Sequence, residues 1–332
     1  VICDLPDHED ERFQLVRYEL HALQHNLNRG IRLRDFRVPA SNLLQPPRGD
    51  GLTIAYHGLN RGRVALCAQA AGTMRRLLAS MVTWSQERIT HGQPLVMREL
   101  ILRRLGRLAA LIVGCDALAN WSATLLDHGY RGELEGIVTK VFASDALREA
   151  AVELALKTHG GRSFLKGHPV GDYLHDYLAT SIYEGESELL SLAFIRTLMK
   201  PVSTPPADST GSGSGNIGSG GNIGSGGSNP QLAELRALGG ELRAAQRRHG
   251  AALAERQCLL AEISARMQRL IVQLVVQQYG AVRDDECVRR AAIVLTDDLR
   301  RQLQGSRPSE DEYQRVVELG RRVSESGFPA SA

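Results

Sequence analysis

The stretch "ILRRLGRLAALIVGCDALA" (residues 101–119) decides the fold class. One set of its apolar side chains recurs at alternating spacings of four and three residues: Ile101, Leu105, Leu108, Ile112, Cys115 and Ala119. Because an α-helix completes a turn about every 3.6 residues, this spacing puts the whole set on one face. The stretch therefore predicts a long helix that buries one continuous apolar stripe.

Two other segments carry the same kind of stripe. The first consists of Val64, Cys67, Ala71, Met74, Leu78 and Met81. The second consists of Ile137, Val138, Val141, Leu147, Ala151 and Leu154. Gly160 and Gly161 follow the second stripe, and glycine readily ends a helix. Long helices with short connections pack antiparallel, so residues 51–200 are predicted to form a helical bundle.

Residues 1–48 are the least helical part of the chain. In "GIRLRDFRVP" (residues 30–39), Ile31 and Leu33 alternate with polar residues, and Phe36 and Val38 follow. This pattern predicts a short half-buried strand near a bend. The stretch "QPPRGDG" (residues 45–51) then marks a loop and a boundary.

The C-terminal third begins with a Gly/Ser-rich segment over residues 201–230. It has almost no apolar content, so we expect a flexible linker there. Residues 231–325 are predicted to be helical again, with an apolar stripe at Leu253, Leu260, Ile263, Met267, Leu270 and Leu274. An interfacial membrane helix in this region is the alternative, but packing against protein is favoured.

Composition narrows the function classes. A net charge of +3 over 332 residues argues against a nucleic-acid footprint. The five cysteines include no C-x-x-C pair, which favours reduced thiols in a cytoplasmic setting. Ten scattered histidines show no metal-ligand spacing, so no metal site is expected. The sequence has no run of 18 apolar residues, so no membrane-spanning helix is expected.

One acid has a distinctive context in "SIYEGESELL" (residues 181–190). Glu184 stands between Tyr183 and Gly185, and an apolar run follows. Taken alone, Glu184 is either a working base or an acid that complements a helix N-terminus. No G-x-x-x-x-G-K-[ST], H-E-x-x-H or G-x-S-x-G element occurs in the sequence, so those chemistries have no support.

The order of four segments resembles the acyl-CoA dehydrogenases. They are "RVPASNLL" (37–44), "HGLNRGRVALCAQAAGTMRRLL" (57–78), "SQERITHGQPL" (85–95) and "THGGRSFLKGHPVGDYLHDYLATSIYEGESELL" (158–190). In that family a strand domain ending in Val-Pro leads into a helical domain. R-x-x-F-G, Q-x-x-G-G and Y/F-E-G-T elements follow in this order. Residues 247–282 and 289–303 look like the extra C-terminal helical domain of the very-long-chain branch.

The resemblance implies a mainly α fold in four parts. Residues 1–48 would be the end of a truncated middle β-domain, and residues 51–200 the antiparallel helical bundle of the dehydrogenase C-terminal domain. The linker 201–230 and a second, smaller helical domain over 231–325 would follow. Because so little of the β-domain is included, we expect residues 1–332 alone to retain FAD weakly or not at all.

The resemblance also assigns roles to residues. Glu184 falls on the base that takes the α proton of an acyl-CoA thioester while FAD accepts a hydride. Long-chain substrates are expected. Asn60, Arg63, Tyr183 and Gly185 match substrate-site positions. The positions matched to the cofactor site are Arg88, Thr90, Gly92, Gly160, Gly161 and Glu186. Arg88 matches an arginine that contacts the FAD of a neighbouring subunit, which implies a homodimer. Electrons would pass to an electron-transferring flavoprotein.

The chain departs from the family pattern at four positions. His91 replaces a phenylalanine, Lys157 a glutamine, and Arg162 a small residue. Glu186 takes the place of a threonine whose hydroxyl faces the flavin. These departures keep open a second reading, in which the chain is a non-catalytic, dehydrogenase-like scaffold for assembly or dimerisation.

Overall fold

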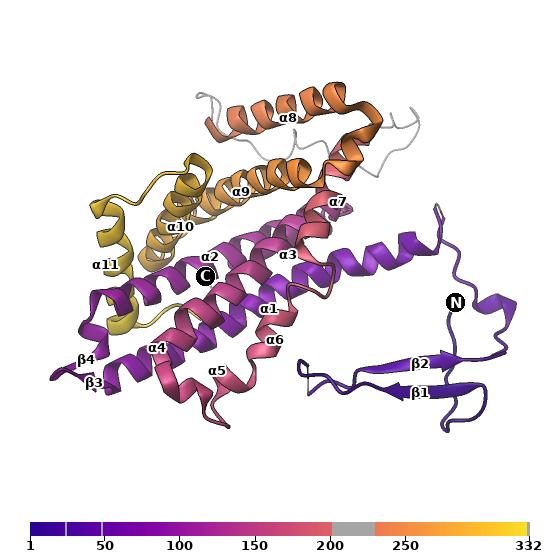
Figure 1. Cartoon of the computed structure of the whole chain (residues 1–332), viewed down its shortest axis with the longest axis horizontal. Coiled ribbons are helices and arrows are strands. Elements are labelled where there is room, and N and C mark those ends of the chain that lie inside the picture. The colour runs from indigo at the N-terminus through magenta and orange to yellow at the C-terminus, as the bar shows by residue number, and fades with distance from the viewer. Residues whose placement is uncertain (24, 48, 201–229, 331–332) are drawn as a thin grey trace.

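The structure is a computed structural model that describes residues 1–23, 25–47, 49–200 and 230–330. Almost all of these residues from Gly51 onward lie in helices, and strands are few (Figure 1). The prediction of a mainly α fold is therefore confirmed. The expected flexible linker lies outside the described residues, apart from its last position.

The N-terminal residues form one β-hairpin. Strand β1 (Phe13–Arg17) pairs antiparallel with β2 (Arg29–Leu33), and a short 3-10 helix, η1 (Ala40–Asn42), follows. The strand prediction is confirmed, but the expected half-burial was wrong. Ile31 is 54% exposed and Leu33 43% exposed, because no second layer covers the hairpin among the described residues. The β1–β2 loop touches the bundle, where the Leu23 amide donates to the Asp176 carboxylate.

Three long helices build the bundle: α1 (Gly51–Glu87), α2 (Glu99–Asp127) and α3 (Glu133–Arg148). α1 begins at a capping box between Asp50 and Thr53. A tight hairpin of β3 (Ile89–Thr90) and β4 (Gln93–Pro94), with the short helix η2 (Leu95–Met97), joins α1 to α2. The predicted stripes on α1 and α2 are buried almost completely and form the centre of the core.

The remainder of the bundle consists of shorter pieces. α3 continues as the π-helical segment η3 (Glu149–Leu156) and ends in α4 (Lys157–His159). Gly160 then has φ +64°, so it ends the helix as predicted. The later elements are η4 (Gly160–Phe164), α5 (Pro169–Asp172), α6 (Leu174–Ala179) and α7 (Ser187–Met199).

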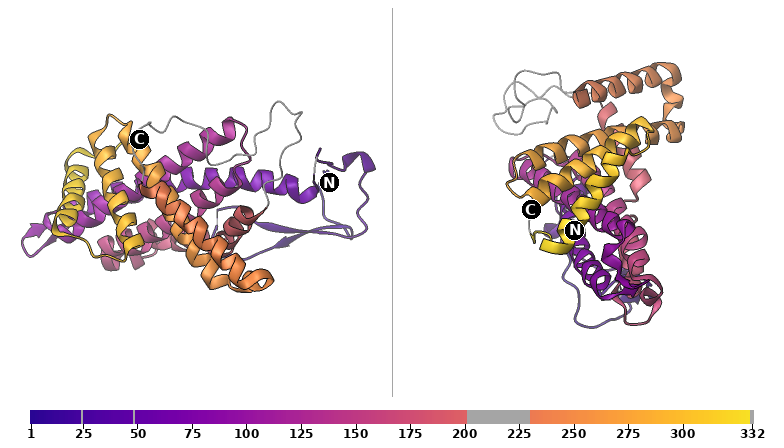
Figure 2. Two further views of the ribbon diagram at one scale, coloured as in Figure 1. Left: turned by 90° about the horizontal axis from the view of Figure 1, so that it is seen from above. Right: turned by 90° about the vertical axis from the view of Figure 1, so that its left-hand side faces the viewer.

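The tail consists of α8 (Pro230–His249), η5 (Gly250–Glu255), α9 (Gln257–Ala281), α10 (Glu286–Gln304) and α11 (Glu310–Ser326). These helices lie on one side of the bundle (Figures 1 and 2). α9 packs on α7, and α10 and α11 pack on α2. The tail and the bundle therefore share one continuous apolar core.

Two glycines let α11 approach α2 closely. A Cβ atom on Gly320 would lie 1.8 Å from the carbonyl oxygen of Leu102. A Cβ atom on Gly106 would lie 2.0 Å from the carbonyl oxygen of Val316. Neither position could carry a side chain without moving one helix backbone away from the other.

A partly buried ion-pair network also joins the tail to the bundle. The Arg107 guanidinium on α2 lies 2.7 Å from the Glu149 carboxylate and 2.7 Å from the Asp298 carboxylate on α10. Burial alone would lower the pKa of Arg107, but the two carboxylates raise it overall. Because both acids are engaged by one guanidinium, the network fixes how α10 sits on the bundle.

α2 is long and apolar enough to cross a membrane by length and composition. Charged residues interrupt α2, so it contains no unbroken run of 18 apolar residues. In the structure α2 is the central helix of the bundle, and 61% of its most apolar window is buried. Its apolar character is therefore explained by its position in the core.

Candidate active site

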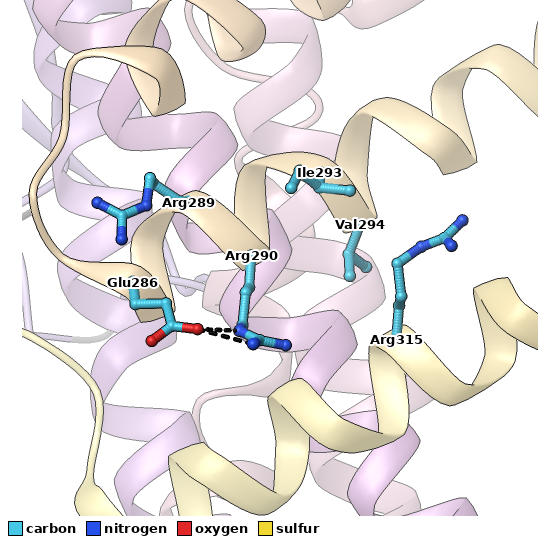
Figure 3. Close-up of a pocket in the computed structure, with 6 residues that line it drawn as sticks. All are labelled: Glu286, Arg289, Arg290, Ile293, Val294 and Arg315. Carbon is cyan, nitrogen blue, oxygen red and sulfur yellow. Dashed lines mark hydrogen bonds and ion pairs between the residues drawn. The ribbon is translucent and has the colours of Figure 1, made fainter.

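The groove between α10 and α11 has a volume of about 310 Å³ (Figure 3). Its lining consists of Glu286, Arg289, Arg290, Ile293, Val294 and Arg315. Glu286 pairs with Arg290, Arg315 pairs with Asp297, and Arg289 donates to two backbone carbonyls. These charges are already satisfied, and no residue predicted for the site lines the groove. The candidate site therefore lies elsewhere.

Glu184 lies on a turn between α6 and α7. Its φ of +59° is in the left-handed region, and Gly185 follows with φ +107°. The Ser187 amide donates to the Ser181 carbonyl (3.2 Å) and closes the turn. A left-handed glutamate is uncommon and is maintained only where surrounding contacts hold it, which is a recurrent feature of functional sites.

Arg63 and Asn60 on α1 provide some of these contacts. Arg63 is 5% exposed, and its Nε donates to the carbonyl oxygen of Glu184 (3.1 Å). Its Nη1 donates to Asn60 Oδ1 (3.1 Å), and Asn60 Nδ2 donates to the Arg131 carbonyl (3.1 Å). Burial lowers the pKa of Arg63, and the negative charge of Glu184 opposes that effect. The structure thus brings Asn60, Arg63 and Glu184 together.

The carboxylate of Glu184 has one oxygen without a partner. Oε2 is buried and receives no hydrogen bond among the described residues. Gly62 on α1 leaves the room that this carboxylate occupies, since a Cβ atom there would lie 2.7 Å from Oε1. Tyr183 lies beside it, and burial together with the Glu184 charge raises the pKa of Tyr183. A half-buried carboxylate with a free oxygen is suited to accept a proton.

Lys140 on α3 belongs to the same cluster, and the sequence reasoning missed it. Its side chain is fully buried, and Nζ donates to the carbonyl oxygens of Ser181 (3.2 Å) and Gly185. Burial lowers the pKa of Lys140 to about 8. One signal could have found it: a lysine stands inside the apolar run "IVTKVF" (residues 137–142), where a charge requires partners.

Glu186 has a structural partner. Its carboxylate accepts hydrogen bonds from the amides of Glu188 (3.0 Å) and Leu189 (2.9 Å), so it is the N-cap of α7. These two hydrogen bonds lower the pKa of Glu186. The family's threonine position is therefore occupied by a helix cap, and a cofactor contact by Glu186 stays a prediction.

The remaining predicted residues gather at the far end of α1. Arg88 is the C-cap of α1 and is exposed, and Thr90 lies in the adjoining hairpin. His91 (φ +49°) and Gly92 (φ +76°) form the two-residue hairpin turn, which requires positive φ at both positions. The histidine that replaces the family's phenylalanine is therefore a turn residue here.

Gly160 and Gly161 lie beside this end of α1. The preceding residue, His159, contacts Ser80 (Nε2 to Oγ, 2.9 Å) and stacks on Trp84. A Cβ atom on either glycine would meet nothing within 4 Å, so the backbone of the pair is open to a ligand. The structure thus brings the glycine pair toward the Arg88 hairpin, where α4, β3 and β4 lie close together (Figure 1).

Arg162 belongs to the same end, where its guanidinium lies 4.0 Å above the Trp84 ring. This stacking holds a positive charge next to the glycine pair. Sequence reasoning treated Arg162 only as a departure from the family pattern. The contact depends on Trp84, which lies 78 positions away along the chain, so local sequence gave no sign of it.

The predicted residues form two clusters, and the structure adds Lys140 to one and Arg162 to the other. The base cluster contains Asn60, Arg63, Lys140, Tyr183, Glu184 and Gly185. The hairpin cluster contains Arg88, Thr90, Gly92, Gly160, Gly161 and Arg162. Arg63 and Arg88 are 25 residues apart on one straight helix, which corresponds to about 38 Å. Within one chain the two clusters do not form a single compact site.

A cavity of about 440 Å³ lies behind the base cluster, between the bundle and the tail. Ser181, Glu186 and Ser187 of the turn line it from one side, and Gln268 and Arg269 of α9 line it from the other. The turn that bears Glu184 is therefore backed partly by the tail. Among the described residues no group of three or more metal-ligating side chains gathers in one place.

Comparison with known proteins relates this architecture to one family. Residues 49–199 match the family model described as the acyl-CoA dehydrogenase C-terminal domain. An acyl-CoA dehydrogenase of Bacillus subtilis (strain 168) is 34% identical over 162 residues, covering 49% of this chain and 42% of that protein. The mitochondrial very long-chain specific acyl-CoA dehydrogenase of Mus musculus is 31% identical over 157 residues, covering 47% and 24%.

A solved structure extends the likeness to the tail. The acyl-CoA dehydrogenase of Bacillus anthracis, crystallised with FAD, superposes with a TM-score of 0.73 over 96% of this chain and 64% of that one. The sequence identity is 17%, so this likeness is one of fold. The matches to the curated relatives span less than half of those proteins' lengths.

Proposed function

We propose that this chain, whose residues 49–199 belong to the acyl-CoA dehydrogenase family through its C-terminal domain, supplies the base for α,β-dehydrogenation of an acyl-CoA thioester. One observation carries the proposal: the Glu184 carboxylate has a buried oxygen without a partner, on a left-handed turn held by Arg63. A merely structural glutamate would be expected to use its carboxylate, as Glu186 does in capping α7.

Glu184 is proposed to take the proton from the α carbon of the thioester. Arg63 and Asn60 hold the backbone of the turn, so the carboxylate is already oriented when substrate arrives. Tyr183 and Gly185 flank the base, one as a wall and the other as space for the thioester. The flavin, when bound, accepts the hydride that leaves the β carbon.

The hairpin cluster fits the diphosphate part of FAD. The backbone at Gly160 and Gly161 is open, and the exposed guanidinium of Arg88 is available to face phosphate. Because this cluster lies about 38 Å from the base cluster along α1, we assign it to the flavin of a second copy. A homodimer in which each copy completes the other's site follows from that assignment.

Further properties are proposed from the family. FAD is the cofactor, and an electron-transferring flavoprotein is the electron acceptor. Long-chain acyl-CoA is the expected substrate class, because the tail sequence resembles the extra helical domain of the very-long-chain branch and a very long-chain specific acyl-CoA dehydrogenase is among the similar proteins. The five free cysteines fit a cytoplasmic setting. The division into residues 1–48, 51–200 and 231–325 stays a prediction.

A scaffold is the second candidate function. Two departures favour it, since Lys157 pairs with Glu153 on the exposed face of η3 and α4 and Glu186 is used as a helix cap. A scaffold needs neither a free carboxylate oxygen nor an open glycine pair. The enzyme proposal accounts for both.

The absorbance of the intact protein separates the two candidates. An enzyme should show a flavin band that a long-chain acyl-CoA bleaches. Glu184→Gln should keep the flavin band. The rate at which acyl-CoA bleaches it should fall by on the order of a thousandfold or more, because a carboxamide cannot accept the proton. Glu188→Gln, at an exposed acid in the first turn of α7, is the matched control and should bleach normally. Undiminished bleaching in Glu184→Gln would contradict the base assignment, and an intact protein without flavin would favour the scaffold.

A further inference from the structure

We propose that Lys140 is a positioning residue for the base: its ammonium holds both ends of the turn that carries Glu184. This inference rests on the proposed function of Glu184. The lysine lies on α3, one helix away from the arginine that holds the same turn from α1. Lys140 makes no contact with the Glu184 carboxylate itself, so its effect on the reaction would be exerted through the backbone.

The geometry is that of a clamp. Nζ donates to the carbonyl of Ser181, before the turn, and to the carbonyl of Gly185, after it. It also lies 3.5 Å from Ser187 Oγ. The Ser181 carbonyl additionally accepts the Ser187 amide, so one oxygen receives both the clamp and the hydrogen bond that closes the turn. Glu184 is enclosed between these attachment points.

Two cations on two helices thus hold the carbonyls of this short turn. Arg63 binds the Glu184 carbonyl and Lys140 binds the carbonyls on either side of it. A left-handed φ at a glutamate is unfavourable in isolation. The turn keeps that conformation because its carbonyls are held by side chains of α1 and α3.

A fully buried ammonium is costly unless each donor has a partner. All three donors of the Lys140 ammonium have partners: two meet the carbonyls of Ser181 and Gly185, and the third meets the hydroxyl of Ser187. The charges that act on it are those of Glu186, Asp145, Arg63 and Glu184. If Lys140 only filled the core, an apolar side chain could replace it without loosening the turn. If Lys140 holds the carbonyls of the turn, the same replacement loosens the turn.

The test compares Lys140→Met with Lys157→Met in the intact protein. Methionine keeps an unbranched chain of similar length and removes the donors, and Lys157 is an exposed lysine of the same bundle. Amide hydrogen exchange is measured at Tyr183 and Ser187, which are bonded within the turn, and at buried residues of α2. Lys140→Met should speed exchange at the turn at least about tenfold and leave α2 unchanged, as expected for a local opening. Lys157→Met should change neither.

The second readout uses the acyl-CoA reaction. Lys140→Met should slow flavin bleaching at least about tenfold while the dissociation constant of acyl-CoA changes less than about threefold, because the Lys140 side chain is fully buried and bonded to the turn. If the amides of the turn exchange in Lys140→Met at the wild-type rate, the clamp is overturned. Faster turn exchange with an unchanged bleaching rate overturns the positioning role. A wild-type protein that never bleaches refutes the proposed function instead, and the clamp is then judged on exchange alone.

A measurement on the wild type covers the case in which Lys140→Met does not fold. Exchange of the Ser187 amide, corrected for its intrinsic pH dependence, should quicken as Lys140 loses its proton near pH 8. Exchange in α2 should show no such step. A Ser187 amide equally protected from below about pH 8 to above pH 10.5, the ordinary pKa of lysine, overturns the proposal.

Discussion

Gly62 of α1 and Glu184 of the α6–α7 turn share one space: a Cβ atom on Gly62 would lie 2.7 Å from Glu184 Oε1. The neighbouring residue, Arg63, holds the backbone of Glu184 from the same helix turn. α1 therefore fixes the base in two ways, by a hydrogen bond to its carbonyl and by the absence of a side chain beside its carboxylate.

We expect Gly62→Ala to displace the carboxylate without unfolding the protein. The atom that the new methyl group meets is the end of a flexible side chain, which can rotate away. Proton abstraction depends on carboxylate position, so bleaching of the flavin by acyl-CoA should slow about a hundredfold. Gly58→Ala, one turn earlier on α1 with open space around it, is the control and should bleach normally. Equal rates in the two variants would show that the carboxylate is not confined by Gly62.

Lys140 gives a prediction about stability and pH. Burial lowers its folded pKa to about 8 from an ordinary value of 10.5. Below about pH 8 the lysine is charged in both states, and the full cost of burying the charge is present. Between about pH 8 and 10.5 the unfolded chain keeps a proton that the folded protein has released. Wild-type stability should therefore rise relative to Lys140→Met by up to about 1.4 kcal/mol per pH unit.

Urea unfolding at a series of pH values measures this difference. Lys157→Met serves as the control for losing an exposed lysine. Parallel stability curves for the wild type and Lys140→Met across this range would mean that the folded protein keeps the Lys140 proton to the same pH as the unfolded chain, so that burial does not lower its pKa.

The glycine contact between α2 and α11 predicts how the tail is held. Gly320→Ala would put a methyl group 1.8 Å from the Leu102 carbonyl, so α11 must move away from α2. Overpacking of this kind costs about 1–3 kcal/mol. We expect earlier proteolytic cleavage of the tail and a lower melting temperature. Gly240→Ala, on α8 with open space around it, should instead be neutral or stabilise by up to about 1 kcal/mol. Unchanged cleavage in Gly320→Ala would argue against close α2–α11 packing.

The sequence allowed the helices to be predicted because their signal is local. The α2 stripe from Ile101 to Cys115 repeats at helical spacing, and every member is buried. The local sequence gave no sign that Gly62 and Gly320 are needed for close approach. The residue opposite each of them lies more than 100 positions away along the chain. Lys140 was missed for the same reason, since its partners lie on a turn 41 or more positions further along.

The candidate site was predictable only where a motif carried it. Glu184 stood out through its Tyr-Glu-Gly context, and the clustering of Asn60 and Arg63 with it followed from the resemblance. The role of Glu186 could not be foreseen, because its carboxylate can cap a helix or face a ligand with the same sequence around it. The structure shows the cap through two amide hydrogen bonds, and a cofactor contact by Glu186 stays a prediction.

The separation of the base and hairpin clusters predicts complementation between damaged copies. In the proposed two-fold dimer, each site takes Glu184 from one copy and Arg88 from the other. Glu184→Gln and Arg88→Ala homodimers should both be inactive, the first for lack of a base and the second for weakened flavin binding. In a mixed dimer one site carries both defects and the other carries neither. Random reassociation of equal amounts should therefore restore about a quarter of the wild-type sites.

The alternative arrangement predicts a different result. If Glu184 and Arg88 served the same site within one copy, each site of a mixed dimer would carry one defect, and mixing would restore nothing. Mixing two preparations of the same variant is the control and should stay inactive under either arrangement. Activity is followed as flavin bleaching after reassociation. Because Arg63 and Arg88 are about 38 Å apart on the rigid helix α1, we expect recovery in the mixed sample alone.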